Sequence, residues 1–196
     1  MSAGRATLHA PSARDRAAFL AAVHRSRRLH RPWVQPPGDA DAFAAWRRRC
    51  GGPDHAGFLA LAPDGQPAGV VNLNHIVRGA LRSAYLGFYA FEPYAGRGLM
   101  RDALGQALRR AFGPLALHRV EANVQPDNAA SLGLIRGLGF RCEGFSPRYL
   151  KIGGRWRDHQ RWALLAEDWK PRARVPLGDG VEHILLRPRR EGAAGG

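Results

Sequence analysis

The chain has 196 residues, and 45% of them are apolar, as is typical of one globular domain with a packed core. No apolar run reaches the roughly 18 residues of a membrane-spanning helix, and the first residues lack the apolar segment of a signal peptide. The two cysteines, Cys50 and Cys142, have no metal-ligand neighbours at useful spacing. The composition therefore predicts a cytoplasmic protein without a disulfide framework, a metal site or a membrane segment.

The first half of the chain predicts two helices and the beginning of a sheet. Ser12 to Asp15 has the form of a capping box, with an acid three residues after the cap. Apolar residues then recur at helical spacing until Pro32. In chain order we expect a strand at 6–9, a helix from the capping box to Pro32, a helix at 41–50, and strands at 58–62 and 68–76 joined by a tight turn.

The second half continues with further strands and helices. We expect strands at 85–91 and 118–124, helices at 98–112 and 127–138, a strand that begins at Phe140, and a hairpin of 145–152 with 155–166. Strands mixed with helices and hairpins predict an α/β domain of the α+β kind over residues 1–170. Residues 171–196 form a basic extension whose end we expect to be disordered.

A corner rich in glycine joins the strand at 85–91 to the helix that follows it. Its sequence is Gly96-Arg97-Gly98-Leu99-Met100. Glycine lets a ligand lie against the backbone, and the first N–H groups of a helix have no partner inside the helix. The helix dipole adds partial positive charge there, so the corner predicts an anion site of the kind that phosphate occupies. A tight turn without a ligand is the commoner reason for a lone Gly-x-Gly.

Several short motifs follow this corner in order. They are Asn128-Ala-Ala-Ser131, Leu138-Gly139-Phe140, Glu143-Gly144, Tyr149-Leu150, Gly154-Arg-Trp-Arg-Asp-His159 and Glu167-Asp-Trp-Lys-Pro171. With this order and spacing, the stretch from about Leu86 to Pro171 resembles the GNAT superfamily of acetyl-CoA-dependent N-acetyltransferases. Within that superfamily it is most similar to the RimJ/RimL ribosomal-protein alanine N-acetyltransferases.

The resemblance implies a GNAT-like fold, which is a mixed, largely antiparallel sheet with flanking helices. Its two central strands, here 85–91 and 118–124, splay apart in such enzymes. The pantetheine arm of acetyl-CoA, the acetyl donor, would enter the gap and pair with backbone near Ala90 and Phe91. The pyrophosphate would lie on the N–H groups from Gly96 to Met100, in agreement with the anion site. Asn128 matches a position that contacts the cofactor, although helix capping would also explain this residue.

The resemblance also suggests catalytic residues. Ser131 matches a serine proposed as the general acid, and a capping role is the alternative. The glutamate proposed as general base in these relatives falls at Arg148, and another branch places its base at the position of Asn123. Neither residue is an acid, so we expect Glu121, on the same strand face as Asn123, to be the base. A salt bridge to Arg119 is the alternative explanation of Glu121, and Glu92 or a water could serve instead. Asp158 and His159 on the last strand could line the acceptor channel, although we favour Asp158 as the partner of an arginine and His159 as pointing elsewhere.

Three functions remain open at this stage. The first is transfer of an acetyl group to the α-amino group of a protein N-terminus, by direct attack in a ternary complex. The second is acetylation of a small-molecule amine, such as an antibiotic or a polyamine. The third is a basic module that binds RNA or the ribosome and has lost catalysis. The net charge of +14 would favour ribosome association, although a GC-rich genome also enriches arginine. We expect a monomer or a homodimer.

Overall fold

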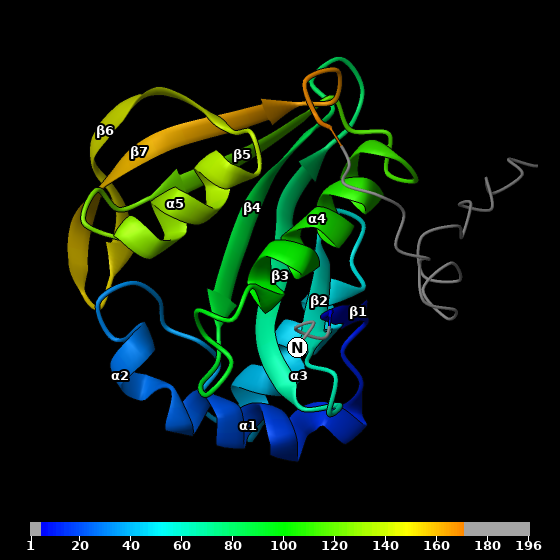
Figure 1. Cartoon of the computed structure of the whole chain (residues 1–196), viewed down its shortest axis with the longest axis vertical. Helices are drawn as coiled ribbons and strands as arrows, with labels where there is room; N and C mark the ends of the chain where they lie inside the picture. Colours follow the sequence, from blue (N-terminus) through cyan, green and yellow to red (C-terminus); the bar gives the residue numbers. More distant parts are fainter. Residues whose placement is uncertain (1–4, 171–196) are drawn as a thin grey trace, which may run out of the picture.

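A seven-stranded mixed sheet forms the centre of the protein, in a computed structural model that describes residues 5–170 (Figure 1). The strand order is β1-β2-β3-β4-β5-β7-β6, and each neighbouring pair is antiparallel except β4 with β5. The strands are β1 (Thr7–His9), β2 (Ala56–Leu61), β3 (Pro67–Val77), β4 (Ser83–Ala90), β5 (Arg119–Val124), β6 (Arg141–Ile152) and β7 (Arg155–Leu165). The predicted α+β class is confirmed, and the predicted extension at 171–196 lies outside the described residues.

The parallel pair β4 and β5 separates partway along its length. The register joins Ser83 to Arg119, Ala84 to Val120 and Tyr85 to Glu121, and it ends there. Strand β4 nevertheless continues to Ala90 and β5 to Val124. Figure 1 shows the two strands diverging from their common end. The splayed central strands are therefore confirmed, and the divergence opens the sheet at the carboxyl ends of both strands.

Helices cover both faces of the sheet. They are the 3-10 turn η1 (Ala13–Asp15), α1 (Arg16–Arg25), α2 (Arg27–His30), α3 (Ala40–Cys50), α4 (Leu99–Phe112) and α5 (Ala129–Gly137). The capping box of Ser12 and Asp15 is present as predicted. In residues 5–170 no helix is long and apolar enough to cross a membrane.

The predicted first helix is broken at Ser26, which the sequence analysis did not foresee. The Ser26 hydroxyl donates to the carbonyl of Ala22 at 2.7 Å, a back-bond that bends helices. The same oxygen accepts from the backbone N–H of Glu92 at 2.9 Å. This tertiary bond ties the α1–α2 junction to the end of β4, so α2 can approach the diverging strands.

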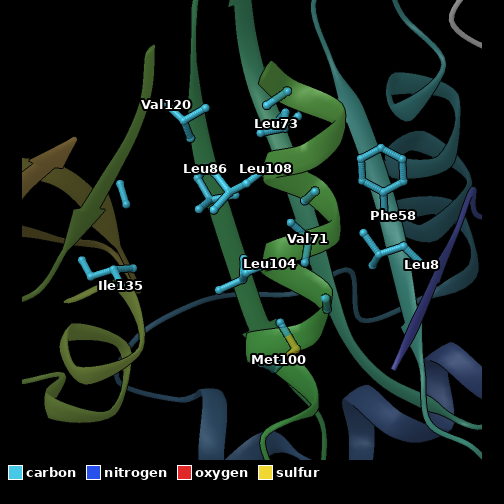
Figure 2. Packing of buried hydrophobic residues seen from close by; sticks show 14 of the residues in the cluster. Leu8, Phe58, Val71, Leu73, Leu86, Met100, Leu104, Leu108, Val120 and Ile135 are labelled. Carbon is cyan, nitrogen blue, oxygen red and sulfur yellow. The ribbon is translucent and has the colours of Figure 1, made fainter. Parts of the chain in front are cut away.

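Two hydrophobic clusters hold the helices on the sheet. On one face, Leu104 and Leu108 of α4 pack with Val71 and Leu86 of the strands (Figure 2). On the other face, α1 and α3 bury an aromatic cluster that includes Phe19 and lies against β2, β3 and the residue after β4. Strand alternation separates the two clusters. Full burial of each leucine stabilises the fold by about 1.5–3 kcal/mol, which fixes α4 and the corner before it.

Candidate functional site

A cleft of about 720 Å³ lies where β4 and β5 diverge. Its walls come from α2 and the loop after it, β3, β4, the start of α4, the end of β5, α5 and the β6–β7 hairpin. These elements are far apart in the sequence, and the gap in the sheet is what brings them together. Among the residues that line the cleft in the described chain, none is aspartate, glutamate or lysine.

One wall of the cleft is the exposed edge of β4. The N–H of Phe91 donates to the carbonyl of Ala68 at 2.8 Å, so the backbone of Phe91 points toward β3. Backbone groups alternate along a strand, and those of Phe88 and Ala90 therefore point the other way, toward the cleft. The Ala90 carbonyl also accepts from Nε2 of His30 at 2.7 Å. Of the two residues expected to pair with a ligand, Ala90 lines the cleft and Phe91 does not, because Phe91 is fully buried in the aromatic cluster.

The glycine corner forms a second wall. Gly96 and Gly98 have φ angles of 77° and 81°, in the left-handed region that glycine tolerates best. Gly98 is the N-cap of α4, so the first N–H groups of that helix follow it directly. Gly96, Gly98 and Met100 line the cleft, whereas Arg97 and Leu99 do not. A Cβ built on either glycine would meet no atom within 4 Å, so the space before the corner is open.

Positive charge at this corner comes from Arg101 in the first turn of α4. Its side chain lines the cleft, and Nη2 donates to the carbonyl of Gly137 at the end of α5 at 3.0 Å. Arg97 instead lies over the ring of Tyr94, with 6.0 Å between its guanidinium carbon and the ring centroid. The helix dipole and Arg101 together favour an anion at the start of α4.

The start of α5 forms the third wall. Asn128 is the N-cap of this helix, and its Oδ1 accepts from the backbone N–H of Ser131 at 3.0 Å. The capping role of Asn128 is therefore confirmed. Because the bond uses the amide oxygen, the amide nitrogen can still donate to a ligand. Asn128 and Ser131 both line the cleft, and the bond leaves the Ser131 hydroxyl out of the cap.

The acidic residues considered as bases lie away from the cleft, whereas Asn123, at the other base position of the relatives, lines it. Glu121 accepts from Nε of Arg119 at 2.8 Å, and the same guanidinium bonds Glu143. This guanidinium lowers the pKa of the Glu143 carboxyl. Neither Glu121 nor Glu92 is among the residues that line the cleft. The backbone N–H of Arg148 donates to Asp158 at 2.7 Å, so this position serves the β6–β7 hairpin.

Two histidines line the cleft, although neither was among the residues expected to bind the cofactor or to react. His30 is 4% exposed and His159 is 2% exposed, and both line the cleft. Burial lowers the pKa of each ring, which favours the neutral form. The sequence signal for His159 was its place at the end of the Gly154–His159 motif. Only the pairing of β7 with its neighbours shows that this residue faces the cleft.

A separate group of potential metal ligands lies outside the cleft. It consists of Asp54, His55 and His75, whose ligand atoms lie within 4.8 Å of one another. These residues belong to the β2–β3 side of the sheet, and none of them contributes to the cleft. The sequence analysis expected no metal site because the two cysteines lack metal-ligand neighbours, and it did not consider these three residues, of which His75 is distant in the chain from the other two.

The splayed sheet, with a glycine corner on its cleft, defines the acetyltransferase class of the GNAT fold. Residues 5–141 match the family described as Acetyltransferase (GNAT) domain, and the chain belongs to this family. It is 42% identical over 103 residues to the [Ribosomal protein uS5]-alanine N-acetyltransferase of Escherichia coli (strain K12). That alignment covers 53% of each protein, so the chain spans about half the length of this curated relative.

Two solved structures are similar over most of the chain. RimJ of Mycobacterium smegmatis, in complex with CoA-disulfide, superposes with a TM-score of 0.74 at 31% identity, over 83% of this chain and 82% of that one. Ribosomal-protein-S5-alanine acetyltransferase from Vibrio fischeri superposes with a TM-score of 0.73 at 26% identity, over 85% of this chain and 96% of that one. The resemblance to RimJ-like acetyltransferases is thus confirmed in both sequence and fold.

Proposed function

We propose that this protein transfers the acetyl group of acetyl-CoA to the α-amino group at the N-terminus of a protein. The observation that carries the proposal is the meeting of the β4 edge and the glycine corner in one cleft. An extended amide chain can pair with the first, and a pyrophosphate can bind the second. Acetyl-CoA contains both an extended amide chain and a pyrophosphate, and these follow one another as the β4 edge and the glycine corner do in the cleft.

The cleft suits acetyl-CoA in its details. The outward backbone groups of Phe88 and Ala90 would pair with the pantetheine amides, as an added strand pairs with a sheet edge. The pyrophosphate would lie on the N–H groups that begin α4, where the open space before Gly96 and Gly98 admits it. Asn128 would donate its amide N–H to the same ligand. The similar RimJ structure that contains CoA-disulfide supports this placement.

The chemistry needs a neutral amine that attacks the thioester carbonyl and a proton for the departing thiolate. We assign the second task to Ser131, whose hydroxyl is not used by the helix cap. Its position at the start of α5 supports this assignment, because Ser131 lines the same cleft as the β4 edge that would hold the pantetheine arm. The ion pair with Arg119 favours a structural role for Glu121.

An α-amine suits this cleft better than a lysine or a polyamine. The pKa of an α-amine is about 7.7–8.0, against about 10.4 for a lysine amine, so an α-amine loses its proton more easily. The described cleft has no carboxylate that would bind a polycation. The uS5-alanine enzyme to which the chain is similar supports an N-terminal alanine as acceptor. The net charge of +14 supports an encounter with the ribosome, whose proteins would be the acceptors.

The test combines binding with turnover. Calorimetry should show saturable binding of acetyl-CoA at one site, and an N-terminal alanine peptide should stimulate release of CoA. The competing reading, a basic module without catalysis, predicts no acetyl-CoA binding and an RNA affinity that falls steeply with salt. Turnover with spermidine but not with the peptide would instead support the small-molecule function.

A further inference from the structure

His159 occupies a position in the cleft that faces away from α5. Residues alternate between the two faces of a strand, and Trp162 and Leu164 of β7 pack in the same cluster as Ile135 of α5. His159 therefore lies on the opposite face of β7, the face that it shares with Arg161. Since Ser131 belongs to α5, the two polar residues line the cleft from opposite sides of the sheet.

The His159 ring is held in one protonation pattern. Its Nδ1 lies 3.0 Å from the carbonyl of Arg157, and a carbonyl can only accept, so the proton is on Nδ1. The lone pair of the neutral ring is then on Nε2. The ring of Tyr149 on β6 packs against it, with 5.9 Å between centroids. These contacts fix the ring with a basic nitrogen in a buried site.

Burial keeps the His159 ring neutral near pH 7. It lowers the pKa of the ring, and the hydrogen bond to the Arg157 carbonyl and the charge of Asp158 raise that pKa to a smaller extent. The phenol of Tyr149 on β6 belongs to the ring that packs against His159, and Arg161 follows two residues later on the same face of β7. Strand β5 pairs with β7 next to His159, where Asn123 lies beside Arg161 and Val124 lies beside Gln160. Neither β5 residue carries a charge.

The second histidine of the cleft is less suited to take a proton. Nε2 of His30 donates to the Ala90 carbonyl. Its Nδ1 is buried and has no hydrogen-bond partner among the described residues. The ring is enclosed by Tyr89 and Phe91, at centroid distances of 5.3 and 5.7 Å. His30 therefore holds the end of β4 in place, while the basic nitrogen that it retains is sealed from the cleft.

We propose that Nε2 of His159 is the general base that takes the proton of the acceptor amine. This inference rests on the proposed function and supplies the base that Glu121 does not provide. The amine nitrogen forms a bond with the thioester carbonyl carbon and gives its proton to His159. The carbon–sulfur bond then breaks, and the sulfur takes a proton from Ser131. Solvent returns a proton to Ser131 and removes the proton that His159 gained. The products are the amide and CoA, with base and acid acting from opposite sides of the sheet.

The test uses two substitutions that separate structure from chemistry. In His159→Asn the side-chain amide can still donate to the Arg157 carbonyl, but it has no basic nitrogen. In His159→Ala both the donor to the Arg157 carbonyl and the basic nitrogen are lost, and imidazole added to the solution can replace the base. We expect kcat to fall by about 10²-fold in both variants, the acetyl-CoA affinity to stay within about twofold, and imidazole to restore part of the His159→Ala rate. His118→Asn, an exposed histidine paired with Glu167, is the matched control and should keep full activity.

The pH profile supplies a second readout that a structural role would not change. With the wild type, log kcat/KM should rise with a slope of about two at low pH, where the amine and His159 both carry protons, and about one above the lowered pKa of His159. His159→Asn should show a slope of about one throughout. Full activity of His159→Asn beside an active wild type would overturn the inference and leave the proposed function standing. A wild type that transfers no acetyl group to any amine would overturn both.

Discussion

Asn128 and Ser131 are joined by one hydrogen bond at 3.0 Å, from the backbone N–H of Ser131 to the side chain of Asn128. The cap of α5 therefore uses the backbone of the serine and leaves its hydroxyl for chemistry. This arrangement separates two properties that the sequence analysis could not separate, namely helix capping and proton donation, and each can be tested with one substitution.

Ser131→Ala removes the hydroxyl and keeps the capped N–H. We expect the melting temperature and the acetyl-CoA affinity to stay close to those of the wild type, while kcat falls by about 10²-fold because the thiolate loses its proton donor. Steady-state kinetics and calorimetry measure the two effects separately. A normal kcat in this variant would show that Ser131 has no part in the chemistry.

Asn128→Asp and Asn128→Ala separate capping from ligand binding. Aspartate is also a good N-cap, so Asn128→Asp should keep the stability, but it removes the amide donor and adds a negative charge near the anion site. Asn128→Ala should lose the cap and about 1 kcal/mol of unfolding free energy. We expect the affinity for acetyl-CoA to fall in both variants. Equal affinity of Asn128→Asp and the wild type would limit Asn128 to capping.

Gly98→Glu tests the anion site at the start of α4. The new side chain would occupy the open space before the helix and repel the pyrophosphate, so acetyl-CoA binding should be lost. The left-handed backbone makes any side chain there unfavourable by about 1–2 kcal/mol. Gly79→Glu is the matched control, since Gly79 has a φ of 70° and equally open surroundings but lies outside the cleft. Loss of binding in both variants would point to strain, and retained binding in a folded Gly98→Glu would refute the site.

Glu121→Gln tests whether the paired carboxylate takes part in catalysis. Arg119 holds Glu121 and also bonds Glu143, so the guanidinium keeps one partner when the charge of Glu121 is removed. We expect kcat/KM to fall by less than about tenfold. A loss of about 10³-fold would make Glu121 the base and would remove that role from His159.

Local signals predicted much of this fold, and tertiary contacts decided the remainder. The capping box at Ser12 and the corner at Gly98 depend on residues that are neighbours in the chain, so both could be predicted from the sequence. The helix break depends on the bond between Ser26 and Glu92, which are distant in the chain. The orientation of Phe91 depends on its bond to β3, which no local pattern shows.

The same distinction applies to the candidate site. The glycine corner and the Asn128–Ser131 turn are continuous segments, and their motifs were recognisable. His159 enters the cleft only through the pairing of β7 with its neighbours. Periodicity showed which residues share a strand face, as for Glu121 and Asn123, but it could not show that Arg119 holds the first of them.

The most direct test of the central claim is a competition within one acceptor peptide. The peptide carries a free N-terminal alanine and one internal lysine, and mass spectrometry locates the acetyl group after partial reaction at pH 7. At this pH roughly a tenth of the α-amine is neutral, compared with far below one per cent of the lysine amine. We predict acetylation of the N-terminal alanine alone, and none when that terminus is blocked. Acetyl groups found mainly on the lysine, in either peptide, would contradict the account.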